Sequence, residues 1–269
     1  MKIFLDKSKI IKETHKYKNI GFVPTMGALH NAHISLIKKS IKQSNKTIVS
    51  IFINKPQFNK KNDFIKYPRN LRKDISILKN LKIDILYLPS HKEIYPNGSN
   101  KNIKIDKFSK QLCGKFRLRH FESIIDVVDR FIKIIRPKNI YLGEKDFQQL
   151  ILIEKYIRVN SIKTKVVRCR TLREDSGLPY SSRNLLLSKK EKEIASKVYR
   201  FVKNKKKDLI KKKISNKVLC DKISQLGINK IEYLKLLDVN KIIKPFKKSI
   251  KNKIFIAYYI GLIRLIDNI

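Results

Sequence analysis

Short apolar runs alternate with amphipathic stretches over the first two thirds of the chain. Residues 47–53 (TIVSIFI) form a largely apolar run, as expected of a strand that is buried on both faces. In residues 33–43, by contrast, Ile34, Ile37 and Ile41 fall on one side of a helix. The same patterns predict strands at 19–23, 85–88, 139–142 and 165–168, and helices at 70–81, 121–135 and 147–159. This alternation predicts an α/β fold with a parallel sheet and helices on both of its faces.

The pattern changes after residue 173. Residues 188–191 (SKKE) form a capping box that predicts a helix reaching about residue 205. The lysine-rich stretch 203–213 is expected to be solvated, and short strands are expected at 231–237 and 254–259. We therefore expect two domains, one of residues 1–173 and a smaller α+β domain of residues 174–269.

The chain is strongly basic, with 63 Lys and Arg against 22 Asp and Glu and a formal charge of +41 over 269 residues. A nucleic-acid-binding protein is one interpretation of this charge. However, the lysines are dispersed from Lys2 to Lys253, and Lys, Ile and Asn, which have codons rich in A and T, dominate the sequence. We therefore favour a compositional bias over a specific nucleic-acid partner, while expecting the positive field to attract anions.

The spacing of the cysteines and the length of the apolar segments indicate the cellular compartment in which the protein works. The three cysteines, Cys113, Cys169 and Cys220, are widely spaced and form no disulfide framework, which indicates a reducing environment. The N-terminus lacks the apolar core of a signal peptide, and the longest apolar run, 254–263, is half the length of a membrane span. We expect a cytoplasmic protein without a membrane anchor.

Candidate chemistry is expected at the strand-to-helix corners, because open parallel sheets bind ligands at the carboxyl ends of their strands. Residues 24–33 (PTMGALHNAH) form the first corner, with His30 and His33 at the start of a helix. Helix N-termini and imidazole N–H groups both suit phosphates. A metal pair or two surface histidines are the alternatives, and since no nearby cysteine or acidic cluster supplies further ligands, no metal ligand is predicted among the side chains.

Three other segments carry polar side chains in suggestive places. Residues 50–58 (SIFINKPQF) set Asn54 and Gln57 just past a buried strand, although an ordinary turn explains them equally well. In residues 141–150 (YLGEKDFQQL), Gly143 is expected to permit a tight turn, and Asp146 either caps a helix or binds a ribose hydroxyl.

Residues 178–184 (LPYSSRN) combine two hydroxyls with a guanidinium, as an anion clamp requires. A catalytic serine nucleophile is the more specific alternative for these serines, but they do not lie in the GxSxG motif that forms a nucleophile turn. Residues 113–121 form a basic loop that either covers a phosphate site or is plain surface.

Taken together, these segments resemble the pantothenate synthetase (pantoate–β-alanine ligase) family. Its members read PTMGxLHxGH, FVNPxQF, YPR, LCGxxRPGHFxGV, FGEKDxQQL, DGLAxSSRN and RLIDN. This chain carries PTMGALHNAH (24–33), FINKPQF (52–58), YPR (67–69), LCGKFRLRHF (112–121), LGEKDFQQL (142–150), SGLPYSSRN (176–184) and RLIDN (264–268). The order and spacing hold from end to end, and GEKDxQQL followed by SSRN is the most specific part.

The resemblance implies a Rossmann-like N-terminal domain that binds ATP and pantoate, and a C-terminal lid domain. It implies ATP-dependent ligation of (R)-pantoate and β-alanine through a pantoyl adenylate, with Mg²⁺ accompanying ATP and a homodimeric assembly. By matching motif positions, the catalytic residues are His30, His33, Lys145, Ser181, Ser182 and Arg183. The implied ATP contacts are these six together with Pro24, Thr25, Met26, Gly27, Gly143, Glu144, Asp146, Val167, Pro179 and Tyr180. The implied pantoate contacts are Met26, Asn54, Gln57, His120 and Gln149.

The chain departs from the family pattern at several positions. Ala32 replaces the glycine of HxGH, where the added methyl is expected to weaken ATP binding. The other departures are Lys55-Pro56 for Pro-x, Leu118-Arg119 for Pro-Gly, Ser123 for a helix glycine and Ser176 for Asp. Three alternatives remain open: another nucleotidyltransferase of the same superfamily, a nucleic-acid-binding protein, and an inactive homologue.

Overall fold

The computed structural model describes residues 1–242 and 252–269, and the chain divides into two compact units. The first unit contains Met1–Ser109 and Arg117–Thr171, and the second contains Lys110–Phe116 and Leu172–Ile269. The second unit thus includes a short segment that sequence reasoning had placed in the N-terminal domain. The functional division at residue 173 remains a prediction.

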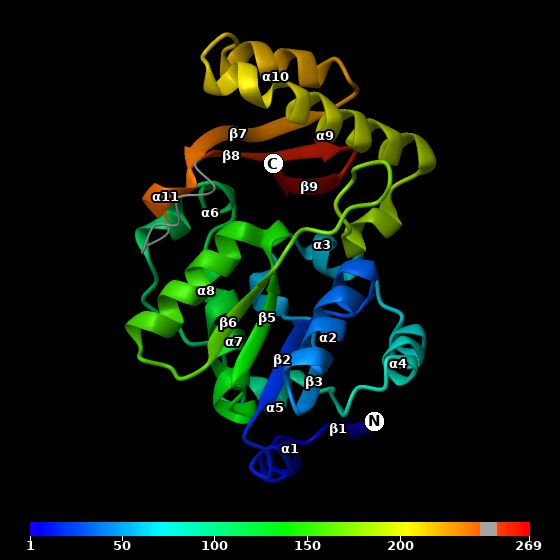
Figure 1. Ribbon diagram of the computed structural model, residues 1–269, viewed down its shortest axis with the longest axis vertical. Coiled ribbons are helices and arrows are strands. Elements are labelled where there is room, and N and C mark those ends of the chain that lie inside the picture. The colour runs from blue at the N-terminus through cyan, green and yellow to red at the C-terminus, as the bar shows by residue number, and fades with distance from the viewer. Residues whose placement is uncertain (243–251) are drawn as a thin grey trace. The chain divides into compact units, whose positions relative to one another are not determined.

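The first unit is built on a six-stranded parallel sheet with strand order β1-β4-β3-β2-β5-β6 (Figure 1). Its strands are β1 (Lys2–Phe4), β2 (Ile20–Thr25), β3 (Lys46–Ile51), β4 (Ile85–Tyr87), β5 (Asn139–Gly143) and β6 (Lys165–Cys169). Its helices are α1 (Lys7–Thr14), α2 (Asn31–Gln43), α3 (Lys61–Ile65), α4 (Leu71–Asn80), α5 (His91–Ile94), α7 (His120–Ile135) and α8 (Phe147–Val159). Three short 3₁₀ helices complete it: η1 (Lys55–Gln57), η2 (Lys107–Lys110), which reaches the second unit with its last residue, and η3 (Glu144–Asp146). The predicted parallel sheet is confirmed.

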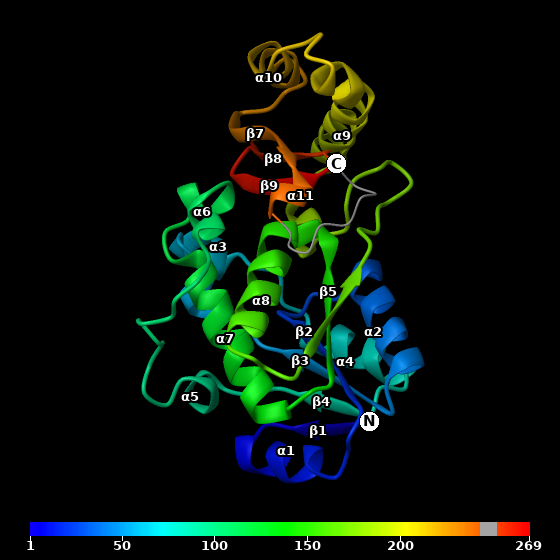
Figure 2. The ribbon, with the colours of Figure 1, turned by 60° about the vertical axis from the view of Figure 1, so that its left-hand side comes forward.

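Helices cover both faces of this sheet because its strands are apolar on both sides. Val23 and Val49 pack with residues of α2 and α4 in one buried cluster. Phe22, one position before Val23, points the other way and contacts Phe131 of α7 with ring centroids 5.5 Å apart. Adjacent strand residues therefore serve opposite layers, as the two-residue period of a strand requires. Figure 2 shows α7 and α8 on one side of the strands and α2 and α4 on the other.

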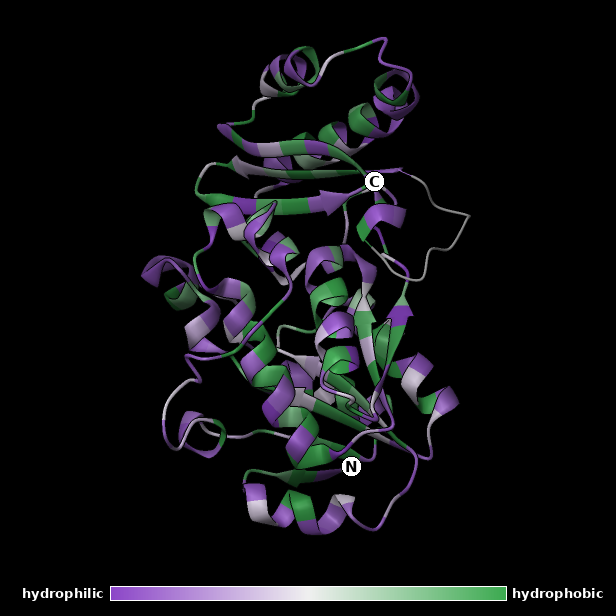
Figure 3. Ribbon diagram, turned by 90° about the vertical axis from the view of Figure 1, so that its left-hand side faces the viewer, coloured by the Kyte–Doolittle hydropathy of each residue, from purple (hydrophilic) through white to green (hydrophobic). Residues whose placement is uncertain are grey.

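The second unit is an α+β layer structure. An antiparallel sheet of order β7-β8-β9 is formed by β7 (Lys230–Asp238), β8 (Asn252–Ile260) and β9 (Ile263–Asn268). Its helical elements are α6 (Cys113–Phe116), η4 (Ser182–Leu186), α9 (Lys189–Ile210), α10 (Asn216–Ser224) and α11 (Val239–Ile242). The core contains Val198 and Val202 of α9, Leu219 of α10, and Ile254 and Ile256 of β8. Apolar residues (green) and hydrophilic residues (purple) alternate along its helices, as expected of helices with one buried side (Figure 3).

One expectation about this unit needs correction. The helix opened by the Ser188 capping box continues to Ile210 rather than ending near residue 205. It thereby takes in much of the lysine-rich stretch 203–213. This happens because Val202 and Leu209 remain on its buried side, so apolar packing continues while the lysines occupy the other side. In addition, β9 ends the chain as a strand paired with β8.

A buried ion pair ties the loop after β6 to the last strand of the second unit. Arg173 donates to both carboxylate oxygens of Asp267, at 2.7 and 2.8 Å, and to the carbonyl of Gly177 at 3.1 Å. Its guanidinium also lies 4.1 Å from the centre of the Tyr199 ring. Gly177 has φ +90°, and a Cβ there would lie 2.3 Å from that ring, so only glycine fits. These contacts hold residues 174–184 against β9 and α9.

Among the described residues, no helix is long and apolar enough to cross a membrane.

Replacing Asp267 with Asn should lower the free energy of unfolding by about 3 kcal/mol, because it leaves the buried Arg173 charge without its partner. Chemical unfolding followed by circular dichroism measures the change. Asp208→Asn is the matched control, since Asp208 pairs with Lys205 at 3.2 Å on the surface and its loss should cost less than about 0.5 kcal/mol. Equal losses in the two variants would contradict this account of the Arg173 pair.

Candidate functional site

The strand order places a topological switch between β2 and β5. From β2 the chain proceeds outward through β3 and β4, and it then returns to the other side of β2 to form β5 and β6. Open parallel sheets bind ligands outside the carboxyl ends of the strands at such a switch. Here those ends lead into the 26–29 turn after β2 and into η3 after β5.

A buried carboxylate shapes the 26–29 turn. Asp74 of α4 accepts hydrogen bonds from the backbone N–H groups of Ala28 and Leu29, both at 2.8 Å. Gly27 and Ala28 both have positive φ, +79° and +50°, and a Cβ on Gly27 would lie 3.0 Å from Asp74. The side chain of Thr25 also accepts the N–H of Gly27 at 3.2 Å. Asp74 therefore holds a strained turn in place, with α2 beginning two residues after Leu29.

Sequence analysis did not single out Asp74. In sequence it is one polar residue in an amphipathic helix, and only its position on the buried side of α4, one turn before Leu78, could have drawn attention to it.

The two histidines of the first corner lie together at the start of α2. Their rings stack with centroids 3.9 Å apart. Burial, and next the positive charge of Lys145, lower the pKa of His30 to about 4. Burial, followed by the charges of His30 and Lys145, holds the pKa of His33 well below its usual value. Both imidazoles are therefore neutral at pH 7, and each can donate one hydrogen bond to an anion while Lys145 supplies the positive charge.

The corner after β5 supplies Lys145 and Asp146. The Lys145 ammonium lies 3.4 Å from the Asp146 carboxylate. Asp146 is the residue before α8 but makes no capping hydrogen bond there, and its side chain is half exposed. Of the two readings of Asp146, the helix cap is therefore wrong, and the side chain can accept from a ligand hydroxyl.

Gly143 does not form the tight turn expected of it. Its φ is −78°, a value that any residue adopts. A Cβ added there would meet no described atom within 4 Å. The glycine is therefore explained neither by backbone geometry nor by crowding within the described chain, and the space in front of it is open to a ligand.

The glutamines of the same segment have different surroundings. Gln148 is buried and donates to the carbonyl of Phe108 at 2.8 Å. Gln149 is partly exposed, on the next position of α8. Gln148 therefore has a structural role, whereas the side chain of Gln149 is accessible to a ligand.

A second group of predicted residues meets around Gln57, which lies in η1 after β3. Its side-chain oxygen accepts from Asn54 at 3.0 Å, and its amide nitrogen donates to the sulfur of Met26 at 3.1 Å. Its backbone carbonyl lies 2.9 Å from Nδ1 of His120 and 3.0 Å from Nη2 of Arg117. Met26, Asn54, Gln57 and His120 are thus brought together as expected, with Arg117 as an additional member. The Arg-x-x-His spacing in residues 117–120 is the sequence signal for that addition.

The predicted residues of the second unit follow one another around η4. The Ser181 hydroxyl accepts from the N–H of Arg183 at 3.3 Å and so begins this helix. Ser182 is buried, whereas Tyr180 and Arg183 are partly exposed. Asn184 is buried and donates to Glu174 and to the carbonyl of Pro179. The remaining ATP candidate, Val167, belongs to the first unit and packs against the buried cluster beside α2.

Within the described part of the chain, no group of three or more His, Cys, Asp and Glu side chains is arranged to hold a metal ion. Mg²⁺ binds through one or two carboxylates together with substrate phosphates and water, and does not need such a cage.

The depressed histidine pKa values make stability depend on pH. Between pH 6.5 and about 4 the imidazole is protonated in the unfolded chain but neutral in the folded chain. Its contribution to the free energy of unfolding is therefore fully present above pH 6.5 and is lost as the pH falls toward 4. We expect His33→Gln to reduce this loss, because glutamine does not titrate and the burial that holds the pKa of His33 well below its usual value then no longer opposes protonation. Urea unfolding at pH 7, 5.5 and 4.5 measures it. His15→Gln, a change at an exposed histidine, serves as the control, and identical profiles for the two variants would refute the assignment.

Comparison with known proteins places this geometry in a family. The sequence model of the pantoate–β-alanine ligase family matches residues 3–269. A pantothenate synthetase from Francisella tularensis subsp. novicida is 42% identical over 266 residues, covering 96% of this chain and 94% of the relative.

Solved structures agree. A pantoate–β-alanine ligase from Francisella tularensis, in complex with beta-gamma ATP and β-alanine, has a TM-score of 0.84 at 39% identity and covers 100% of this chain and 97% of that one. A pantothenate synthetase from Thermus thermophilus has a TM-score of 0.89 at 27% identity, covering 100% and 99%. The chain belongs to the pantoate–β-alanine ligase family.

Proposed function

We propose that this protein ligates (R)-pantoate and β-alanine at the expense of ATP, giving pantothenate, AMP and pyrophosphate through a pantoyl adenylate. The observation that carries the proposal is the pair of neutral, stacked histidines beside Lys145 at the sheet's switch point. Membership of the ligase family supplies the substrates. A protein that only binds a nucleotide would need the histidine corner but not the polar group of Asn54 and Gln57 beside Met26, which suits a second substrate.

In the first step the pantoate carboxylate attacks the α-phosphorus of ATP, and the bond to the pyrophosphate oxygen breaks. Negative charge accumulates on that leaving oxygen, so fixed donors and positive charge around the phosphates stabilise the transition state. His30 and His33 donate hydrogen bonds to phosphate oxygens without carrying charge themselves. Lys145 provides the positive charge, and the first-turn N–H groups of α2 add the dipole of a helix start.

The nucleoside part of ATP is assigned to the corner after β5. We propose that Asp146 accepts from a ribose hydroxyl, which its half-exposed, uncapping carboxylate permits. The open space at Gly143 allows the ribose to approach the backbone. Pro24, Thr25, Met26, Gly27, Glu144 and Val167 complete the proposed ATP contacts of the first unit. In the second unit, Pro179, Tyr180, Ser181, Ser182 and Arg183 are proposed to bind the triphosphate, with Arg183 as a bidentate donor.

Pantoate is assigned to the Gln57 group. The Gln57 and Gln149 amides suit the hydroxyl and carboxylate oxygens of this small acid. Met26 and Asn54 contact the side-chain amide of Gln57, and His120 lies against its backbone carbonyl. A site that binds hydroxyls through such amides selects against acids that lack them, because its own polar groups would remain unpaired.

In the second step the β-alanine amine attacks the acyl carbon, AMP leaves, and an amide bond forms. This sequence needs no covalent enzyme intermediate, so neither Ser181 nor Ser182 is required as a nucleophile. We further propose that Mg²⁺ enters with ATP and is held mainly by phosphate oxygens, that the protein is a homodimer, and that it works in the cytoplasm. Family resemblance supports the last two points.

Pyrophosphate release from ATP and Mg²⁺ tests the function directly. With (R)-pantoate alone we expect a limited burst of about one equivalent per site, because the adenylate accumulates. Adding β-alanine should convert the burst to steady turnover. Release that does not depend on pantoate would indicate another acceptor, and no release from the folded protein would indicate an inactive homologue.

Lys145→Ala should slow adenylate formation by about 100-fold or more, because it removes the positive charge next to the leaving phosphates. Because the Lys145 side chain is only 18% exposed, the melting temperature of the variant is measured in parallel, and the rates are compared where the variant is folded. Single-turnover pyrophosphate release measures the step. Lys163→Ala, an exposed lysine on the same unit, is the control and should leave the rate unchanged. Near-normal turnover in Lys145→Ala would remove that residue from the mechanism.

A further inference from the structure

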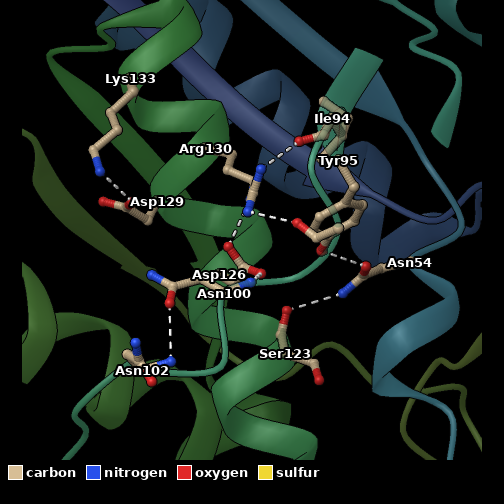
Figure 4. A network of polar contacts seen from close by, with 11 residues as sticks. Asn54, Ile94, Tyr95, Asn100, Asn102, Ser123, Asp126, Asp129, Arg130 and Lys133 are labelled. Atoms are coloured by element: carbon tan, nitrogen blue, oxygen red, sulfur yellow. Dashed lines mark hydrogen bonds and ion pairs between the residues drawn. The ribbon is translucent and has the colours of Figure 1, made fainter. Parts of the chain in front are cut away.

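The side-chain amide of Asn54 is completely engaged. Asn54 is only 1% exposed. Its nitrogen donates to Gln57 Oε1 at 3.0 Å. The same nitrogen donates to the carbonyl of Ser123 at 3.0 Å, and the amide oxygen accepts from the Tyr95 hydroxyl at 2.7 Å (Figure 4). The carbonyl of Ser123 can only accept, so it fixes which end of the Asn54 amide carries the nitrogen that faces Gln57. The Tyr95 hydroxyl then satisfies the remaining Asn54 oxygen and holds the amide in place.

Tyr95 is a reliable donor. It is 4% exposed, and burial raises the pKa of its phenol well above the usual value, so the hydroxyl keeps its proton at any pH at which the protein works. Arg130 packs against the Tyr95 ring, with its guanidinium 4.6 Å from the ring centre, and so fixes the position of the ring. A buried, protonated and stacked tyrosine has little freedom to turn its hydroxyl away from Asn54.

Arg130 holds the segment that carries Tyr95. Its guanidinium donates to the carbonyl of Ile94 at 2.8 Å and to that of Gly98 at 3.1 Å, on either side of Tyr95. It also donates to Asp126, one turn earlier on α7, at 2.6 Å. The second oxygen of this buried carboxylate accepts the N–H of Asn100 at 2.8 Å. Two charged residues of α7 thus bind residues 94–100 at three backbone positions.

The same helix holds Gln57 from the other side. His120, Ser123, Asp126 and Arg130 follow at intervals of three, three and four residues, so they lie along one side of α7. His120 lies against the Gln57 carbonyl, and Ser123 accepts from Asn54 through its own carbonyl. One rigid helix therefore fixes the backbone of Gln57 directly and its side chain through Tyr95 and Asn54.

We propose that Tyr95, held by Arg130 and Asp126, is a positioning residue for pantoate. It acts through Asn54 on the orientation of the Gln57 amide. The proposal rests on the proposed function, in which Gln57 contacts pantoate. Tyr95 acts from the second layer, and its contribution is to hold the Asn54 amide whose nitrogen donates to the Gln57 side chain.

Tyr95→Phe tests the proposal because it removes one hydroxyl and keeps the ring. We expect KM for pantoate to rise about tenfold, equivalent to about 1.4 kcal/mol, with KM for ATP and for β-alanine unchanged within about twofold. Tyr87→Phe is the matched control. Tyr87 is fully buried, its ring also contacts α7, and its hydroxyl has no hydrogen-bond partner within the described chain. Its loss should leave all three constants unchanged.

A double-mutant cycle separates positioning from general loosening. If Tyr95 acts through Asn54, the Tyr95→Phe change should have no further effect on kcat/KM for pantoate in an Asn54→Ala background. Arg130→Lys keeps a charge next to Asp126 but cannot hold both carbonyls, so it should also raise KM for pantoate alone. An unchanged pantoate KM in Tyr95→Phe, equal rises for all three substrates, or additive effects in the cycle would each overturn the proposal. Wild-type turnover that depends on pantoate is the reference, and its absence would instead overturn the proposed function itself.

Discussion

The parallel direction of all six strands is the constraint on which the first unit depends. Parallel strands end at one edge of the sheet, so segments that are far apart in sequence deliver their side chains to the same place. The turn after β2 brings the histidines, η1 after β3 brings Gln57, and η3 after β5 brings Lys145. Helices must link the strands on both faces, and two of them then act on the edge: α4 through Asp74 and α7 through His120. An antiparallel sheet would distribute the same corners over two edges.

Electrostatics at this edge explains why histidines suit a chain of such high positive charge. Lys145 and the burial of the rings oppose protonation of His30 and His33, so the pair remains neutral although the whole chain carries +41. Neutral imidazoles donate hydrogen bonds that are directional, whereas additional cations would mainly strengthen the attraction of any anion. In the proposed mechanism the general field attracts acidic substrates, and the neutral donors distinguish where a phosphate oxygen lies.

Elements with a long, regular pattern could be predicted from the sequence. Helices α2, α7 and α8 and strands β3 and β5 follow from apolar periodicity alone, because their burial is set by local spacing. Strand β1 was missed because three residues carry no period, and it exists only through pairing with β4. The Arg173–Asp267 pair joins residues 94 positions apart, and no local rule connects them. The site shows the same limit, since the motifs identified His30 by its residue type, whereas the roles of Asp74 and Tyr95 are each defined by a contact with a distant segment.

Three of the departures from the family motifs are connected in space. Ser123 stands where the family has a helix glycine, and its hydroxyl lies 3.1 Å from the carbonyl of Pro56, the proline that has moved by one position. The same hydroxyl lies 2.9 Å from the carbonyl of Arg119, which replaces the glycine of Pro-Gly and has φ +56°. The side chain of Arg119 donates to the carbonyl of Lys101 at 3.0 Å. Ser123 therefore links the other two departures through their backbone carbonyls, next to the segment that carries Gln57, so changes that are separate in sequence meet at one place in the fold.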